Sequence, residues 1–262
     1  MSLAPVSSDS RLGNAMGAER VTLLGVRFNR LSRTAALSAL ESTLGREEAR
    51  KVFIVNAHTL NLAWTDPGFR RVLNDADLLL NDGTGVQFAS YLAGEPFPDN
   101  LVGTDLVPEF CHHAAARDAG VFLLGGQPGV GERAAKRLRA LIPGLRICGT
   151  HHGYFPGSQE AGVLHAINRS GAAILLVAFG NPLQEIWIDR NSDRLRCDVC
   201  IGIGGLIDHL SGRLRRAPAW VRKARMEWIH ILWGQPHKWR RYVLGNPQFI
   251  SRALKSRLGW GP

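Results

Sequence analysis

The chain of 262 residues is 45% hydrophobic and 21% charged, which suits one large globular domain with a small appendage and excludes collagen-like, low-complexity and wholly disordered proteins. Its four scattered cysteines are too few for a disulfide scaffold and indicate a reducing compartment. The net charge of +10 is segregated, because residues 213–262 hold 12 of the 32 lysines and arginines and a single acid, so the rest of the chain is close to neutral.

From residue 21, runs rich in leucine and β-branched residues alternate with segments of helical periodicity. This alternation predicts an α/β domain with a Rossmann-like, mostly parallel sheet flanked by helices. The expected strands are residues 21–28, 52–57, 77–80, 121–124, 145–148, 173–179 and 198–203. We expect this domain to span residues 21–210, after a flexible N-terminal arm, 1–20, and before a small basic helical appendage rich in Trp and Arg, 211–262.

Two polar motifs follow the early strands, at the positions where a parallel sheet gathers its ligand contacts. Asn56 and His58 follow the second strand, although a buried or helix-capping histidine would explain His58 as well. Asp82 follows the third strand and precedes Gly83, whose missing side chain lets a ligand approach the backbone. Asp82 is therefore a general-base candidate, and a helix cap is the alternative interpretation.

Later strands end in glycine-rich or polar turns. Gly125 and Gly126 precede a helix start that suits a phosphate, but no acid follows about 20 residues on to hold a ribose, which argues against a nicotinamide cofactor. Gln184 falls in the first turn of another helix, and Gly205 with Asp208 follows the last strand. Because parallel strands end at one edge of a sheet, these turns predict a composite site.

Two further motifs have less specific chemistry. Tyr154 follows the strand expected at 145–148 and is suited to stack on a base. Cys197 and Cys200 have the spacing of half a zinc site, but the sequence has no second pair and they begin an apolar strand. We interpret these cysteines as structural, and we expect neither a bound metal nor a cofactor.

Taken together, the motifs resemble the bacterial WecG/TagA/CpsF family of glycosyltransferases. The matching strings, in the family's order, are Asn-Ala-His at 56–58, Asn-Asp-Gly-Thr-Gly at 81–85, Val-Gly-Thr-Asp-Leu at 102–106, Gly-Asn-Pro-Leu-Gln-Glu at 180–185 and Arg-Ala-Pro at 216–218. The resemblance implies an inverting, metal-independent enzyme that moves a sugar from a UDP-sugar onto a sugar carried by a polyprenyl pyrophosphate. It would work at the inner, cytoplasmic face of the bacterial membrane, in surface or exopolysaccharide synthesis.

The same resemblance implies roles for individual residues. Asp82 would be the catalytic base, and Gln184 and Asn56 would line the donor sugar. The other residues expected to contact the donor or its nucleotide are His58, Gly83, Gly125, Gly126, Tyr154, Gly205 and Asp208. Those expected to bind the acceptor or pyrophosphate groups are Arg216, Arg240 and Arg241.

Three departures from the family's pattern bear on the donor sugar. Asn56 and His58 stand where many relatives have Thr and Asn, and Leu183 replaces a common lysine. Many relatives also have an arginine just before the segment at 102–106, where this chain has Asn100. The sequence therefore leaves glucose, N-acetylmannosamine and its uronate open as the transferred sugar.

The basic segment 213–262 also holds five of the seven tryptophans. Trp and Arg together favour membrane interfaces, and no run approaches the roughly 18–20 apolar residues of a spanning helix. We expect this appendage to bind the anionic membrane surface peripherally. The alternative is a polyanion- or nucleic-acid-binding protein that uses the tail, but the clustered strand-end motifs argue against it, and we expect no nucleic-acid partner.

Overall fold

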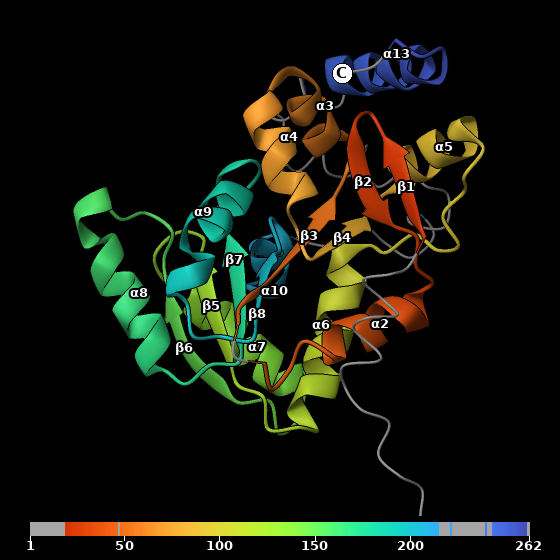
Figure 1. The fold of residues 1–262 in the computed structure, drawn as a ribbon. Helices are drawn as coiled ribbons and strands as arrows, with labels where there is room; N and C mark the ends of the chain where they lie inside the picture. Colours follow the sequence, from red (N-terminus) through yellow and green to blue (C-terminus); the bar gives the residue numbers. More distant parts are fainter. Residues whose placement is uncertain (1–18, 47, 215–220, 222–238, 240–242, 261–262) are drawn as a thin grey trace, which may run out of the picture.

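The computed structural model describes residues 19–46, 48–214, 221, 239 and 243–260. Its centre is a six-stranded sheet of order β4-β3-β8-β7-β5-β6, in which all neighbouring strands are parallel (Figure 1). The strands are β3 (Arg50–Val55), β4 (Leu78–Asn81), β5 (Val121–Gly125), β6 (Ile147–His151), β7 (Ile174–Ala178) and β8 (Val199–Gly202). The predicted Rossmann-like α/β fold is confirmed.

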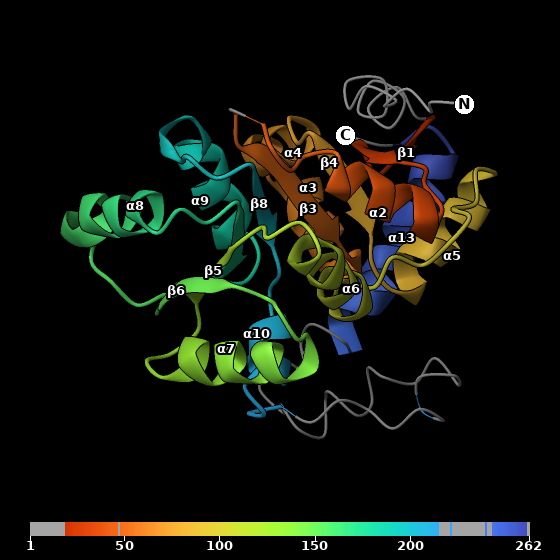
Figure 2. The same cartoon turned by 90° about the horizontal axis from the view of Figure 1, so that it is seen from below.

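Helices cover both faces of the sheet, as Figure 2 shows from below. One layer consists of α2 (Arg33–Glu41), α6 (Gly103–Ala115), α7 (Val130–Leu141) and α10 (Leu206–Leu210). The other consists of α3 (Ala57–Thr65), α4 (Pro67–Asn74), α5 (Thr84–Ala93), α8 (Glu160–Arg169) and α9 (Leu183–Asn191). Two short 3₁₀ turns, Gly157–Gln159 and Ser192–Arg194, lie before α8 and after α9.

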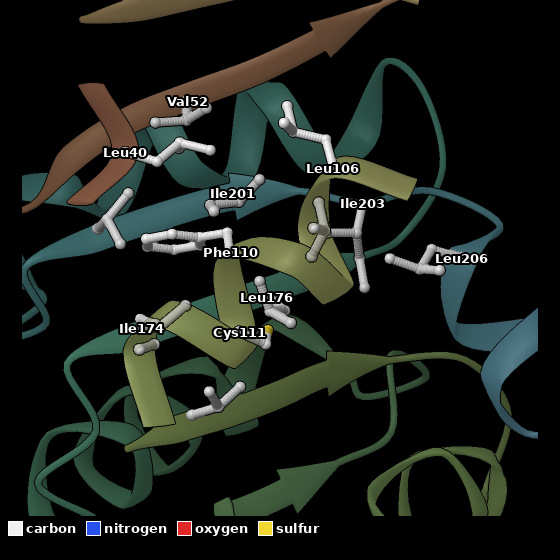
Figure 3. Packing of buried hydrophobic residues seen from close by; sticks show 14 of the residues in the cluster. Leu40, Val52, Leu106, Phe110, Cys111, Ile174, Leu176, Ile201, Ile203 and Leu206 are labelled. Atoms are coloured by element: carbon white, nitrogen blue, oxygen red, sulfur yellow. The ribbon is translucent and has the colours of Figure 1, made fainter. Parts of the chain in front are cut away.

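Each face of the sheet has its own hydrophobic core. Along β7, Ile174 and Leu176 point into the core beneath α6, whereas Leu175 and Val177 point into the opposite core. Figure 3 shows the first of these cores, with Phe110 of α6 packed over the strands. Because both faces are buried, the strands read as continuous apolar runs rather than as alternating patterns, which is why they were visible in the sequence.

The first expected strand, 21–28, is wrong as a single element. The structure has a hairpin instead, with β1 (Arg20–Leu23) antiparallel to β2 (Val26–Asn29). Leu24 and Gly25 form the two-residue turn, and both have positive φ, 52° and 77°. A two-residue turn of this kind matches the twist of the strands that it joins, but only Gly25 marks it in the sequence, so the apolar run looked unbroken.

The last helix, α13 (Gly245–Arg257), packs on α3 and α5 (Figure 1). Phe249 is buried there, and the Asn61 amide of α3 donates to the Gly245 carbonyl at 2.8 Å. Arg252 donates back to the backbone oxygen of Asn61 at 2.8 Å. The described end of the predicted appendage thus contacts the α/β domain, while the boundary near residue 210 stays a prediction.

Some expectations concern the parts of the chain outside the described residues. The predicted flexible arm falls almost entirely on residues 1–18, which lie there. Arg216, Arg240 and Arg241 also lie outside the described ranges. Within those ranges, no helix combines the length and the apolar character needed to cross a membrane.

Candidate active site

The sequence-predicted residues gather at the carboxyl edge of the sheet, because every strand runs in the same direction. In strand order they are Asp82 and Gly83 after β4, Asn56 and His58 after β3, Gly205 and Asp208 after β8, Gln184 after β7, Gly125 and Gly126 at the end of β5, and Tyr154 after β6. The chain moves outward from β3 to β4 at one side and from β5 to β6 at the other. Ligands of parallel α/β sheets bind at the strand ends where the chain diverges in this way.

Asp82 lies in a turn fixed to its neighbours through the backbone. Its N–H donates to the Val55 carbonyl at 2.9 Å, which continues the pairing of β4 with β3 beyond the strand. The next N–H, that of Gly83, donates to Oδ1 of Asn100 at 2.8 Å. Gly83 has a φ of 87° and occupies the N-cap position of α5, so Asp82 stands one residue before the cap, half-buried.

Asn56 caps the helix that follows β3. Its Oδ1 accepts hydrogen bonds from the backbone N–H groups of His58, at 3.1 Å, and Thr59, at 3.2 Å. Such a cap satisfies N–H groups that the first helical turn leaves without partners. The predicted contacts of Asn56 and His58 with a donor stay predictions, and His58 is half-buried in the first turn of α3.

Gln184 joins two strand-end loops. Its Oε1 accepts from the Gly204 N–H after β8 at 2.9 Å, and its Nε2 donates to Glu185 at 2.9 Å. A side chain at Gly202 would displace Gln184, because its Cβ would lie 2.9 Å from the Gln184 Nε2. The sequence places Gln184 in the first turn facing the strand ends, and the structure adds that this side chain is buried, with 2% exposure.

The glycine-rich end of β5 meets the turns on either side of it. A Cβ at Gly125 would lie 2.4 Å from the Ala178 carbonyl oxygen, which accepts the Gly126 N–H at 3.2 Å. The Gly126 carbonyl in turn accepts the Gly153 N–H at 2.9 Å. The residue after Gly153, Tyr154, is 69% exposed, so its ring is accessible for stacking.

The remaining candidates have simpler surroundings. Asp208 of α10 forms an ion pair with Arg213 at 3.7 Å, and its carbonyl accepts the Leu214 N–H at 3.1 Å. Cys197 and Cys200 are buried at the other end of β8, with their sulfur atoms 3.4 Å apart. In the described part of the chain, no three His, Cys, Asp or Glu side chains are grouped so that they could hold a metal ion.

The sequence places Glu185 beside Gln184 in the first turn of its helix, but sequence reasoning missed how Asn100 and Asn81 support the site from within. Asn100 holds the Gly83 turn, and Asn81 donates from its buried amide to the Asp99 carbonyl at 2.9 Å. Glu185 is completely buried, and burial raises its pKa to about 7 although N–H groups of Gln184 and Asn181 favour its ionised form. Local sequence patterns signal only that Glu185 is next to Gln184, and they signal none of the other contacts.

Comparison with known proteins agrees with this geometry. Residues 21–261 match the profile of a family described as glycosyl transferase WecG/TagA/CpsF. The chain is 31% identical over 223 residues to the N-acetylglucosaminyldiphosphoundecaprenol N-acetyl-beta-D-mannosaminyltransferase of Bacillus spizizenii, covering 85% of this chain and 86% of that protein. A protein of the same name from Staphylococcus aureus is 30% identical over 213 residues, which cover 80% of this chain and 83% of that protein.

Proposed function

This chain belongs to the WecG/TagA/CpsF family of glycosyltransferases, and we propose that it moves a sugar from a UDP-sugar onto a sugar carried by a polyprenyl pyrophosphate. The names of the two relatives specify a diphosphoundecaprenol-linked acceptor, which supports a lipid-linked acceptor here. The observation that carries the proposal is that the family's motifs at 56–58, 81–85 and 180–185 follow strands that end at one edge of the sheet. The product would serve bacterial surface or exopolysaccharide synthesis.

Asp82 would act as the base on the acceptor. As the acceptor hydroxyl oxygen forms its bond to the anomeric carbon, its proton passes to the Asp82 carboxylate and the bond from that carbon to the UDP oxygen breaks. UDP leaves from the opposite face, so the configuration inverts. Help of this kind from a positioned base is worth about 10²–10⁴-fold in rate. The half-buried place of Asp82, before a glycine that allows close approach, supports the role.

The other half of the edge would hold the donor. The glycine turns at Gly126 and Gly205 let the backbone approach a diphosphate, and the exposed Tyr154 ring would stack on uracil. Asp208 would accept hydrogen bonds from the nucleotide. Positive charge for the departing UDP and the acceptor pyrophosphate would come from Arg216, Arg240 and Arg241.

The membrane contact would use the basic C-terminal segment. On and just after α13 the exposed apolar side chains are Ile250, Leu254, Leu258 and Trp260. The same stretch, 243–260, contains Lys255 and Arg257 but no acidic residue. A helix with exposed apolar groups and flanking cations suits the interface of an anionic bilayer.

The proposal is tested by release of UDP from a panel of donors: UDP-glucose, UDP-glucuronate, UDP-N-acetylglucosamine, UDP-N-acetylmannosamine and its uronate. Each is incubated with and without a short-chain polyprenyl-pyrophosphoryl sugar. We expect acceptor-dependent release from one donor, reduced about 10²–10⁴-fold in Asp82→Asn, with UDP binding unchanged within about threefold because the base acts on the acceptor. Retained turnover in Asp82→Asn would remove that residue from its role.

Two further outcomes decide between the classes of function. Cosedimentation should show binding to vesicles that contain phosphatidylglycerol and much weaker binding to vesicles of phosphatidylcholine alone, because the C-terminal cations need anionic lipid. Release from no donor, together with salt-sensitive binding to heparin or DNA, would instead favour the polyanion-binding alternative.

A further inference from the structure

Glu185 is the one carboxylate among the described residues that is fully buried, and it lies at the strand-end site rather than in the core of either layer. It is the third residue of α9, next to Gln184. Ionisable groups are rarely buried completely, because removing a charge from water is costly unless hydrogen bonds compensate for it. A buried carboxyl group at this position therefore needs an explanation beyond packing.

The hydrogen bonds of Glu185 converge on a single oxygen. Oε1 accepts from Nε2 of Gln184 at 2.9 Å and from Nδ2 of Asn181. On its other side, Gln184 uses Oε1 to accept the Gly204 N–H at 2.9 Å. The chain of contacts therefore runs from the turn after β7, through the carboxylate, to the turn after β8.

These contacts select one orientation for each amide. An amide can present either its oxygen or its NH₂ group, whereas a carboxyl oxygen that carries no proton, such as the Oε1 that faces these amides, only accepts. Glu185 thus requires the NH₂ groups of both Gln184 and Asn181 to face it, and the Gly204 N–H requires the same orientation of Gln184. One hydrogen of the Gln184 Nε2 and the Oδ1 of Asn181 are then left for other partners.

The second carboxyl oxygen argues against a purely stabilising role. Oε2 of Glu185 is buried and has no hydrogen-bond partner among the described residues. An unsatisfied buried oxygen costs about 1–3 kcal/mol, so an apolar side chain would serve the packing of α9 better. An apolar side chain could not, however, accept the two hydrogen bonds that align the amides of Gln184 and Asn181.

We propose that Glu185 is a positioning residue for sugar transfer, which acts by holding the amides of Gln184 and Asn181 in the orientation that a sugar hydroxyl at the strand ends requires. This inference rests on the proposed function, since the assignment of Gln184 to the donor sugar comes from the family. Glu185 itself touches the two amides and not the reacting atoms.

The test is a double-mutant cycle on donor kcat/KM. Glu185→Leu removes the acceptor, and we expect a loss of about tenfold to a hundredfold, similar to that of Gln184→Ala. In a background that carries both Gln184→Ala and Asn181→Ala, Glu185→Leu should cost no more than about threefold further, because both amides through which it acts are gone. Glu185→Gln retains an oxygen acceptor and should stay within about threefold of wild type.

A matched control separates positioning from damage to the helix. Asn191 lies on the same helix, is equally buried and donates to the Trp187 carbonyl at 3.0 Å, but it is at the end away from the strand ends. Asn191→Leu should change thermal stability and leave kcat/KM within about twofold. If the loss from Glu185→Leu multiplies with the loss from the combined Gln184→Ala and Asn181→Ala changes, or if Glu185→Leu behaves like Asn191→Leu, the positioning role is wrong.

A second readout needs no substrate and so separates this inference from the proposed function. The side-chain amide NMR signals of Gln184 and Asn181, assigned with Gln184→Ala and Asn181→Ala, should shift in Glu185→Leu and stay in place in Asn191→Leu. If the amide signals shift but the wild type transfers no sugar, the proposed function is refuted, while the alignment of the two amides by Glu185 stands. Transfer by the wild type with unmoved signals would refute the inference alone.

Discussion

The carboxyl edge of the sheet has two halves, which are held together in different ways. The β3–β4 half consists of the turns after β3 and β4, and the β5–β8 half consists of the turns after β5, β7 and β8. On the β3–β4 half, asparagine side chains bond the backbone of the turns: Asn56 caps α3, and Asn100 holds the turn at Gly83. On the β5–β8 half, glycine turns bond one another, and a buried carboxylate joins two amides. The described helix near the end of the chain, α13, packs on the β3–β4 half, against α3 and α5.

The difference separates two carboxylates at one edge. Asp82 is half-buried in a turn, whereas Glu185 is fully buried and bonded to amides. Two carboxyl groups in unlike environments can perform unlike tasks. The proposed chemistry uses the half-buried carboxylate of Asp82 directly and the buried one of Glu185 through its neighbours.

The largest loss of stability is expected from a substitution where α13 packs on the β3–β4 half. Phe249 is 2% exposed, and its Cε1 lies 3.7 Å from the position that a Cβ on Gly85 would take. Phe249→Ala removes about 3–5 kcal/mol of packing, so we expect α13 to leave its site before the rest of the protein unfolds. Trypsin should then cleave rapidly after Arg252, Lys255 and Arg257, with UDP binding on the other half unchanged within about twofold.

Ile250 offers a matched control on the same helix. It is 44% exposed, so Ile250→Ala should change stability by no more than about 0.5 kcal/mol and leave cleavage as slow as in wild type. Equal protection of α13 in Phe249→Ala and wild type would mean that other contacts, such as those between Arg252 and Asn61, are enough to hold the helix.

The next effect concerns the buried carboxylate of the β5–β8 half. Burial raises the pKa of Glu185 from 4.5 to about 7, so between these values the folded protein binds more protons than the unfolded chain. Stability should therefore fall as pH rises from about 4.5 to 7, by about 3 kcal/mol in total. Glu185→Gln does not titrate, so its stability relative to wild type should increase by about that amount between pH 5 and pH 8.

Urea denaturation of the two proteins at both pH values measures this change. All other titrating groups are common to both proteins, so their contributions largely cancel in the comparison. A stability difference that is the same at pH 5 and pH 8 would show that Glu185 has an ordinary pKa in the folded protein, in spite of its burial.

The same comparison shows what the sequence could and could not predict. Most strand ends were predictable, because buried parallel strands are apolar runs and a glycine, asparagine or aspartate lies within two residues after each of them, although the strand expected at 145–148 ends only at His151. Asn100 and Gly83 are 17 positions apart in the chain, and the contact between α13 and α3 joins residues more than 180 positions apart. Local patterns carry no signal for such pairs. The burial of Glu185 was hidden as well, because a local sequence pattern does not show how far the fold covers a side chain.

The smallest effect tests how tightly the β5–β8 half is packed around Gln184. In Gly202→Ala the new Cβ would lie 2.9 Å from Nε2 and 3.2 Å from Cδ of Gln184, so this side chain must move. We expect a loss of about 1–3 kcal/mol in stability from the crowding. We also expect a rise in the donor KM, because a displaced Gln184 loses its bonds to Gly204 and Glu185.

Gly162→Ala is the matched control, because this glycine lies in α8 with nothing within 4 Å of the added Cβ. Alanine is favoured over glycine inside a helix by about 1 kcal/mol, so this variant should gain stability and keep its donor KM. Gly202→Ala could instead raise the donor KM as much in the Gln184→Ala background as in the wild type. The added methyl group would then act on the donor site by a route other than Gln184. The tight fit at this strand end would not be what holds the Gln184 amide in place.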